Sequence, residues 1–330
     1  MLFLQYTIST DDENRRIDRV LRKFLKDDLA LSQIYKSLRN GEIRVNNKKV
    51  KQDYKTQKND IIFINEKLIK SKNQENQNIQ NEKSEISKNY PKLEVIFENQ
   101  YVKVINKPYN ISVQKSQKDE IALDEIIKAQ YQPSEKSLSF KPGPLHRLDK
   151  KTTGLLAFSN NLVGAQEFSN ILQNHKITKT YISVLEGNLT SPQKWQDKIA
   201  TNEKTGKDFK TVTVNGDSEN SKEAITEVFP IKTGFFNNKP ITLAKINIYT
   251  GRTHQIRSQC AYHNFPILGD TAYNKNTKKI SQDVDFFLHA YQLSFHETNN
   301  IDLPADLIAP LPKKFTNFLK KYLSIDYFVL

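Results

Sequence analysis

Apolar residues near the start of the chain recur at helical spacing. A helix is predicted over residues 16–25, with one apolar face and arginines on the other. A second helix is predicted over residues 33–40, with Ser32 as its N-cap and Gly41 ending it. The apolar positions of the first helix are Ile17, Val20, Leu21 and Phe24. The pattern therefore indicates two amphipathic helices that share a small core.

A β pattern follows these helices. Residues 42–50 alternate between apolar and polar side chains, and Asn46-Asn47 in the middle favours a tight hairpin turn. Residues 61–64 predict one further strand. We expect a small domain over residues 1–64, which carries 14 basic and 9 acidic side chains.

Residues 65–90 are mainly Asn, Gln, Lys, Glu and Ser, with few apolar side chains. Such a composition cannot bury enough apolar surface to fold alone, so we interpret it as a flexible polar linker. A random coil of this length spans on the order of 28 Å. A solvated helix is the alternative, and it would change only the reach. The first domain is therefore expected to be loosely tethered.

A larger domain is predicted over residues 91–330, where the chain becomes apolar and β-branched. Apolar runs predict strands over residues 93–98, 101–106, 155–158, 179–187 and 286–295, and a helix over residues 165–172. Residues 188–240 predict strands and loops to which we assign no chemistry. Trp195 within them is interpreted as a packing residue.

Charge and composition narrow the class of protein. The net charge of +13 indicates a polyanionic partner, either nucleic acid or an anionic membrane surface. No segment has the ~20 consecutive apolar residues that span a bilayer, and the first residues lack the features of a secretory signal. The single cysteine, Cys260, excludes an intramolecular disulfide and a cysteine-rich zinc site. We expect a cytoplasmic protein without membrane association.

Polar groups gather in one short loop at residues 143–154. His146, Arg147 and Asp149 lie within four positions, and an apolar run follows at once. A polar loop that opens into a buried strand holds its side chains at fixed positions, which suits catalytic groups. A charged surface turn is the structural alternative. The sequence His-Arg-Leu-Asp followed by Thr-Thr-Gly-Leu-Leu resembles the active-site signature of the RluA-type pseudouridine synthases.

Three other stretches resemble the same family. Residues 251–257 match its pattern Gly-Arg-x-His-Gln-Ile-Arg in full, and residues 179–181 match Lys-x-Tyr. Residues 38–46 resemble the alpha-L RNA-binding domain, although a generic basic helix–hairpin unit would look similar. The family's usual Asn-Lys-Pro-x-Gly-x-x-Val-His is altered here, with Asn110 at the Gly position and Gln114 at the His position.

A further departure follows the second motif, where Ser258-Gln259 replace Val-His on a predicted helix that faces away from the chemistry. At position 110, Asn tolerates the left-handed backbone that the family's Gly would adopt. Six scattered histidines give no paired ligand spacing, so no metal is expected, and His254 is interpreted as a structural residue.

The resemblance implies an α+β pseudouridine synthase fold with a mixed, mostly antiparallel central sheet and a cleft. It implies three catalytic residues. Asp149 attacks the uridine, Arg257 pairs with it and keeps it ionised, and Tyr181 stacks on the target base and assists proton removal from C5. Arg147 would fill the space left by the extruded uridine, and no cofactor is required. The implied substrate-binding residues are Arg147, Arg252, His146 and Ile256. The implied RNA-binding residues of the first domain are Arg16, Arg19, Arg39, Arg44 and Lys48.

We therefore expect a monomeric isomerase that converts uridine to pseudouridine in structured RNA, with large-subunit ribosomal RNA as the expected target. One alternative is a non-catalytic RNA-binding or ribosome-assembly protein on the same fold. Another is a hydrolase that uses His146 or His254 with Asp149. The hydrolase is disfavoured because no Ser or Cys elbow lies near these residues.

Overall fold

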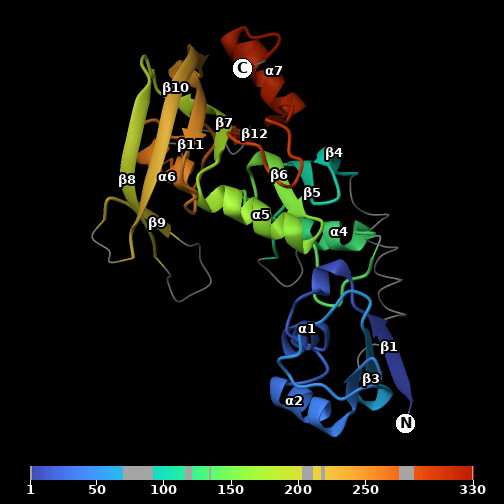
Figure 1. Ribbon diagram of the computed structural model, residues 1–330. Coiled ribbons are helices and arrows are strands. Elements are labelled where there is room, and N and C mark those ends of the chain that lie inside the picture. Colours follow the sequence, from blue (N-terminus) through green and yellow to red (C-terminus); the bar gives the residue numbers. More distant parts are fainter. Residues whose placement is uncertain are drawn as a thin grey trace.

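The computed structural model describes residues 2–69, 92–115, 121–133, 135–202, 211–216, 220–274, 286–328 and 330. Figure 1 shows a small N-terminal unit beside a larger body built on a long sheet. The small unit has a three-stranded sheet and the body a ten-stranded sheet.

The N-terminal unit is built around the two amphipathic helices. Its elements are β1 (Phe3–Thr7), η1 (Thr10–Asp12), α1 (Ile17–Phe24), α2 (Leu31–Asn40), β2 (Ile43–Val45), β3 (Ile61–Asn65) and η2 (Glu66–Leu68). The strand order is β1-β3-β2, with antiparallel pairing throughout. Ile17, Ile34 and Ile62 are fully buried between the helices and this sheet. The apolar spacing thus places both helices correctly.

Several boundaries differ from the sequence-based expectation. Ala30 occupies the N-cap position of α2, so Ser32 lies inside the helix and does not cap it. Asn46 and Asn47 both have positive φ, as a tight turn requires, but the returning arm forms only a bridge from Val45 to Lys48. Ile69 is buried in this unit's core, so the unit extends five residues beyond the predicted end at residue 64.

The large sheet has the order β4-β5-β6-β12-β7-β11-β10-β8-β9, and β13 pairs with β12. Among the described strands only β6 and β12 run parallel, so the sheet is mixed and mostly antiparallel, as predicted. The strands are β4 (Glu94–Glu98), β5 (Val102–Lys107), β6 (Thr153–Ser159), β7 (Ile177–Glu186), β8 (Gln193–Asn202), β9 (Thr211–Val214), β10 (Lys222–Phe236), β11 (Lys239–Ile248), β12 (Leu288–Phe295) and β13 (Asp306–Ile308). The helices are α4 (Leu123–Gln130), α5 (Leu162–Gln173), α6 (Gln255–Tyr262) and α7 (Lys313–Leu323).

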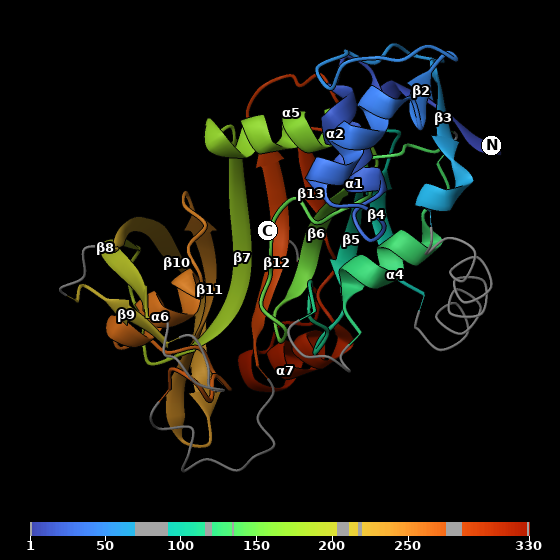
Figure 2. The same ribbon diagram turned by 90° about the horizontal axis from the view of Figure 1, so that it is seen from below.

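Strand β6 is buried along its whole length. Leu155 and Ala157 pack in one core with Phe168 of α5, and Leu156 and Phe158 pack in another with residues of α4. Figure 2 shows these two helices on either side of the strand. The apolar run that follows the polar loop is therefore held between two cores, which makes it a rigid support.

The N-terminal unit is docked on the body, which corrects the expectation of a loose tether. Asp12 accepts hydrogen bonds from the backbone N–H groups of Leu138 and Ser139 at 2.7 and 3.0 Å. Asp11 accepts one from the N–H of Leu162 at the start of α5. Residues 70–90 of the predicted linker lie outside the described residues. Composition alone could not predict these contacts, because they join residues more than 120 positions apart.

Candidate active site

The loop that ends at Asp149 is tied to the buried strand behind it. The N–H of Leu145 donates to the carbonyl of Ala157 at 2.8 Å, and the N–H of Ser159 donates to the carbonyl of Gly143 at 2.9 Å. Gly154, at the start of β6, has a φ of +106°, and a Cβ there would lie 2.2 Å from the carbonyl oxygen of Ala290. Only glycine allows β6 and β12 to approach so closely. These contacts fix where the loop enters the sheet.

A buried lysine supports the same loop from within the protein. The Lys107 ammonium donates to the carbonyl oxygens of Pro108, Lys150 and Thr152 at 3.0, 2.9 and 2.8 Å. Burial lowers the pKa of Lys107 to about 7, and the negative charge of Asp149 acts in the opposite direction. The lysine lies in the altered Asn-Lys-Pro motif, but sequence reasoning gave it no role. We conclude that it holds the backbone on both sides of Lys151.

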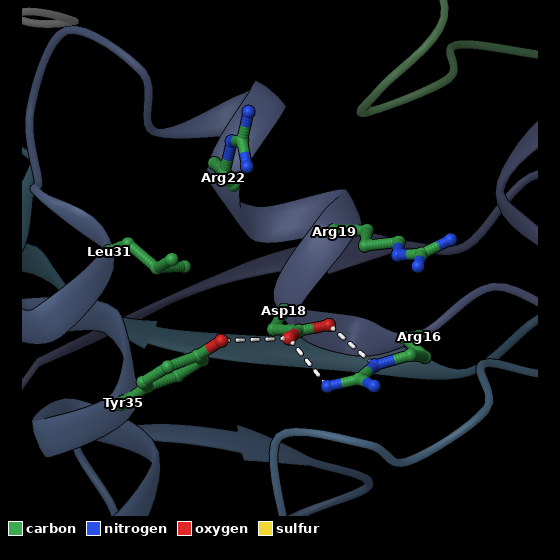
Figure 3. A pocket seen from close by; sticks show the side chains of 6 residues that line it. All are labelled: Arg16, Asp18, Arg19, Arg22, Leu31 and Tyr35. Carbon is green, nitrogen blue, oxygen red and sulfur yellow. Dashed lines mark hydrogen bonds and ion pairs between the residues drawn. The ribbon is translucent and has the colours of Figure 1, made fainter.

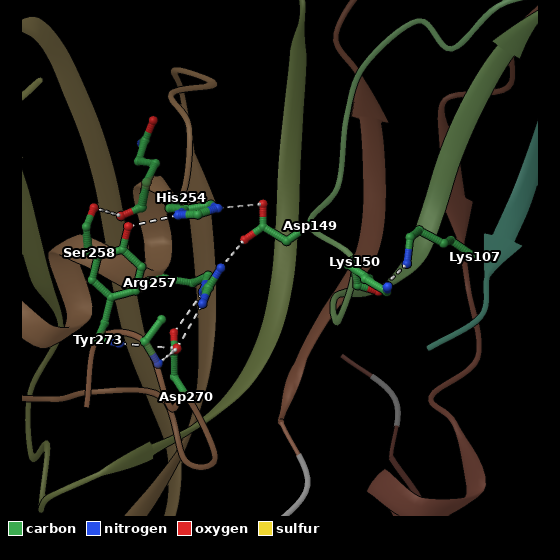
Figure 4. Close-up of polar contacts among 10 residues, drawn as sticks. Lys107, Asp149, Lys150, His254, Arg257, Ser258, Asp270 and Tyr273 are labelled. Carbon is green, nitrogen blue, oxygen red and sulfur yellow. Dashed lines mark hydrogen bonds and ion pairs between the residues drawn. The ribbon is translucent and has the colours of Figure 1, made fainter. Parts of the chain in front are cut away.

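Asp149 faces a fixed guanidinium. Arg257 Nη1 donates a hydrogen bond to Asp149 Oδ2 at 2.9 Å (Figure 4). Its Nε and Nη2 donate to the two oxygens of Asp270 at 2.8 and 2.9 Å. The Asp270 side chain is 1% exposed and that of Asp149 27% exposed. Burial opposes the charge on Arg257, but the hydrogen bonds and charges of the two carboxylates outweigh it and raise its pKa. The guanidinium thus stays charged and cannot rotate away from Asp149.

His254 also faces Asp149, which corrects its interpretation as a purely structural residue. Its Nε2 lies 3.7 Å from Asp149 Oδ1, and its Nδ1 is 2.8 Å from the Tyr273 hydroxyl. The residue has a positive φ of 51° at the start of α6, which turns its ring toward the carboxylate. Burial lowers the pKa of His254, although the charge of Asp149 acts against this. The imidazole therefore favours the neutral form beside Asp149.

Tyr181 lies on β7 and is 6% exposed, in the same core as Leu148 and Ile256. Burial raises the pKa of its hydroxyl, and the negative charge of Asp149 raises it further. The neutral phenol suits stacking against a ring but not service as an anionic base. Ile256 is itself 5% exposed and lies at the start of α6.

The structure does not support a substrate contact for His146. Its Nε2 accepts a hydrogen bond from the N–H of Ala157 at 3.1 Å, and its ring stacks on Phe168. Phe168 belongs to the core on the α5 side, whereas Tyr181 belongs to the other core. Burial and the nearby Lys179 lower the pKa of His146 to about 3. The ring thus fastens the loop to β6 and α5, a contact that the motif could not reveal.

The two other predicted arginines differ in how they are held. Arg252 Nε donates to the carbonyl of Glu223 at 2.8 Å, which ties the loop before α6 to β10. Arg147 is exposed, and its guanidinium makes no hydrogen bond or ion pair with another described residue. Its charge acts on His254, so it lies beside the Asp149 group. Of the predicted substrate-binding residues, Arg147 therefore has the side chain least restrained by contacts with other described residues.

Two of the departures from the family pattern, Asn110 and Gln259, have structural explanations. Asn110 adopts a φ of 63°, so it reproduces the left-handed backbone expected of glycine. Gln259 is fully buried, accepts from the Thr226 hydroxyl at 2.7 Å and donates to Asp197 at 2.7 Å. These partners lie on β10 and β8, so Gln259 faces away from Asp149. The helix as a whole does not, because α6 also carries Arg257, which binds Asp149.

A basic hollow lies on the N-terminal unit. It measures about 220 Å³ and is lined by Arg16, Asp18, Arg19, Arg22, Leu31 and Tyr35 (Figure 3). Asp18 pairs with Arg16 at 2.9 Å and accepts from the Tyr35 hydroxyl at 3.1 Å. This arrangement holds the Tyr35 ring at the hollow.

Arg39 and Lys48 are also exposed on this unit, whereas Arg44 has a structural role. Arg44 Nε donates to the carbonyl of Gly41, and its guanidinium lies 4.9 Å from the centre of the Phe3 ring. Arg44 therefore joins β1 to the end of α2.

The described ranges contain no group of three or more His, Cys, Asp or Glu side chains placed to hold a metal ion. Nor is any helix in them long and apolar enough to cross a membrane.

Residues 101–262, which include every motif described above except the N-terminal one, match the family model described as RNA pseudouridylate synthase. A ribosomal large subunit pseudouridine synthase C from Haemophilus influenzae is 30% identical over 305 residues, covering 89% of this chain and 87% of that protein. The protein of the same description from Buchnera aphidicola subsp. Schizaphis graminum is 29% identical over 319 residues, covering 94% of this chain and 95% of that protein. The structure of human RNA pseudouridylate synthase domain containing 4 has a TM-score of 0.54 and 18% identity, and covers 73% of this chain and 95% of that chain.

Proposed function

Because this chain belongs to the RluA-type family of RNA pseudouridine synthases, we propose that it converts specific uridines of large-subunit ribosomal RNA to pseudouridine. The reaction breaks the bond from the ribose C1′ to uracil N1 and forms a bond from C1′ to C5. The C5 proton is released and N1 gains a proton, so the isomerisation is balanced without a redox step. The names of the relatives support ribosomal RNA as the substrate.

The observation that carries this proposal is the single carboxylate held between a fixed loop and a fixed guanidinium. Asp149 lies in a loop anchored by Lys107, and Arg257 Nη1 lies 2.9 Å from its Oδ2. A carboxyl group attacks in its ionised form and needs one exposed side and a precise orientation. Asp149 meets these requirements and is proposed to attack the target uridine. The neutral His254 on its other oxygen would help to orient it.

A uridine inside folded RNA must leave its stack before Asp149 can reach it, at a cost of a few kcal/mol. We assign the filling of the vacated space to Arg147, because its exposed guanidinium can stack and donate hydrogen bonds. Tyr181 would stack on the extruded uracil as the neutral phenol. Arg252 would support the loop before α6 rather than act on the base.

The N-terminal unit is proposed to bind RNA outside the target nucleotide. The hollow lined by Arg16, Arg19 and Arg22 offers guanidinium groups for phosphates and Tyr35 for a ring. Arg39 and Lys48 would add charge at exposed positions, while Arg44 would contribute through its structural contacts. Action as a monomer in the cytoplasm remains a prediction.

The test is a map of pseudouridines in ribosomal RNA from cells with and without the gene, followed by reconstitution with purified protein. We expect one or a few large-subunit positions to lose the modification and to regain it in vitro. Unchanged ribosomal RNA together with activity on transfer RNA would refute the proposed substrate. No pseudouridine formation on any cellular RNA would refute the activity.

A further inference from the structure

Asp12 joins the N-terminal unit to the body through both of its carboxylate oxygens. Oδ1 accepts from the hydroxyls of Ser137 and Ser139 at 2.9 and 2.6 Å and from the N–H of Ser139 at 3.0 Å. Oδ2 accepts from the N–H of Leu138 at 2.7 Å and from the hydroxyl of Ser9 at 2.9 Å. Asp12 is fully buried. A buried carboxylate that accepts from so many donors is a strong and oriented contact.

The contacts around Asp12 extend the same interface. Arg15 donates to the Ser139 hydroxyl, and the Lys58 ammonium pairs with Glu135 at 3.2 Å. Glu135 also accepts from the N–H and hydroxyl of Thr10. On the other side of Asp12, Asp11 Oδ1 accepts from the N–H of Leu162 at 2.8 Å. Contacts to two separate segments of the body allow one orientation of the unit.

The segment that Asp12 grips leads directly into the catalytic loop. Only residues 140–142 separate Ser139 from Gly143, where the loop begins along β6. The second contact, at Leu162, lies just beyond the end of β6 at Ser159. The N-terminal unit is therefore fastened at both ends of the loop and strand that carry Asp149.

We propose that Asp12 is a positioning residue that docks the N-terminal unit at a fixed place relative to Asp149 and so helps to select the target uridine. This inference rests on the proposed function, because it takes the basic hollow as an RNA contact and Asp149 as the reacting group. Two contacts on one rigid body accept only those uridines that lie at the matching distance from the RNA element held by the hollow. A loosely tethered unit would accept many distances.

The physical basis is effective concentration. When one contact is bound, a rigid connection presents the second contact at high local concentration in one geometry, and a flexible connection spreads it over many. The interface is made mostly of hydrogen bonds and ion pairs, which depend on geometry more strongly than apolar contacts do. Loss of Asp12 leaves several donors of residues 137–139 without their acceptor.

The test compares the full-length wild type with Asp12→Asn and with a Ser137→Ala/Ser139→Ala double variant. Asn at position 12 keeps the shape but turns an amide NH₂ toward donors. The double variant weakens the contact from the body's side and leaves the N-terminal unit unchanged. Asp27→Asn, at an exposed position of the same unit, is the matched control.

We expect both variants to lower kcat/KM on large-subunit ribosomal RNA by about tenfold or more, mainly through KM. Turnover of a short RNA that reaches only the active site should stay within twofold of wild type. Small-angle X-ray scattering should show an increase in the radius of gyration for both variants. Asp27→Asn should keep the wild-type radius of gyration.

The docking proposal would be overturned if both variants had the wild-type radius of gyration and wild-type kinetics on ribosomal RNA. The proposed function would then remain intact. Equal losses on the long and short RNA would also overturn the docking proposal, because selection would not depend on the docked unit. Failure of the wild-type protein to modify either RNA would instead refute the proposed function.

Discussion

Arg257 holds two carboxylates with different exposures, and this division suggests different roles. Asp270 is buried and receives two nitrogens, so it orients the guanidinium, while Asp149 receives the third and keeps one side open. A planar fork can serve both carboxylates at once, which a lysine could not do. The arginine next to Asp149 in sequence, Arg147, has no such fixed partner among the described residues. The two arginines should therefore fail in different ways.

Arg257→Ala is expected to lower the single-turnover rate equally on structured and unstructured RNA, because it disturbs the chemical step. It should also reduce stability by about 3–5 kcal/mol, since Asp270 loses its buried partner. Arg147→Ala should be impaired on structured RNA but partly rescued on an unstructured RNA, where the uridine is already unstacked. Single-turnover rates of both variants on both RNAs test this. Equal rescue of the two variants would contradict the assigned roles.

Lys107→Met should displace the catalytic loop. Methionine keeps the length of the side chain but leaves the carbonyls of Pro108, Lys150 and Thr152 without a donor. We expect kcat to fall by about 10- to 100-fold, through misplacement of Asp149, and stability to fall by about 1–3 kcal/mol. Lys103→Met on the same strand, which breaks only an ion pair with the half-exposed Glu98, is the control. Equal kcat values for the two variants would show that Lys107 does not position the loop.

The residues of the site could be predicted only where a motif carried them. Asp149 and Arg257 stand in two distinct motifs, and the structure brings them into contact. Asp270 and Tyr273 were missed because their role depends on contacts with α6 that no local pattern records. His146 is the opposite case, a motif residue predicted as a substrate contact whose ring stacks on Phe168, a contact that no motif records.

At the scale of elements, the site depends on the parallel pairing of β6 with β12. His289 on β12 is fully buried, with Nδ1 2.8 Å from the Thr153 hydroxyl and Nε2 3.2 Å from the Ala309 carbonyl. The carbonyl can only accept, so Nε2 carries the proton and Nδ1 accepts from the Thr153 hydroxyl. This neutral ring joins the start of β6 to the chain after β13. Protonation would reverse the direction of the bond to Thr153 and place a positive charge in the core.

Part of the pH dependence of stability follows from this ring. Burial lowers the pKa of His289 to about 4, although its hydrogen bond to Ala309 acts in the opposite direction. The unfolded chain, with a pKa near 6.5, therefore binds more protons between pH 6.5 and 4. We expect the neutral His289 ring to contribute its full share of the free energy of unfolding above pH 6.5. This share should fall by up to about 1.4 kcal/mol per pH unit as the pH falls toward 4.

Urea unfolding between pH 7 and 4 checks this expectation. His289→Gln should reduce the slope and leave the part that His146 contributes, whereas His296→Gln, at an exposed position, should keep the full slope. The same slope in His289→Gln as in wild type would show that another group is responsible.

Elements with strong periodicity were predicted well, and short or edge elements were not. The buried run of β6 and the apolar faces of α1 and α5 lie where their patterns indicated. β1 was missed because an edge strand of five residues gives little signal. β8 to β10 were left unassigned because their polar tracts hide the alternation, although β10 alone has 15 residues. Trp195 on β8 proves to be a packing residue, stacked on His263.

At the scale of the whole molecule, the two expected RNA contacts belong to one docked assembly. The sequence predicted both the basic unit and the catalytic body, but not their relation, because composition describes a linker and not the surfaces beside it. The net charge of +13 is consistent with RNA binding over a wide surface. The basic hollow on the N-terminal unit should supply a measurable share of this binding.

Replacing Arg16, Arg19 and Arg22 together by Gln should weaken binding to ribosomal RNA. The slope of log affinity against log salt concentration should become shallower by up to about three, which corresponds to three lost phosphate contacts. The physical reason is that each phosphate contact releases counterions when it forms. Binding measured between low and moderate salt tests this. A control replaces three exposed lysines of α7 by Gln, namely Lys313, Lys320 and Lys321. An equal loss in both variants would indicate a diffuse charge effect and no special role for the hollow.

The most direct test of the central claim, that Asp149 is the attacking group, is single-turnover pseudouridine formation by Asp149→Asn on large-subunit ribosomal RNA. The amide keeps the shape of the side chain and removes the nucleophile. We predict no detectable product, with RNA affinity within a few-fold of wild type because the charged surfaces are intact. Measurable turnover by Asp149→Asn would contradict the account.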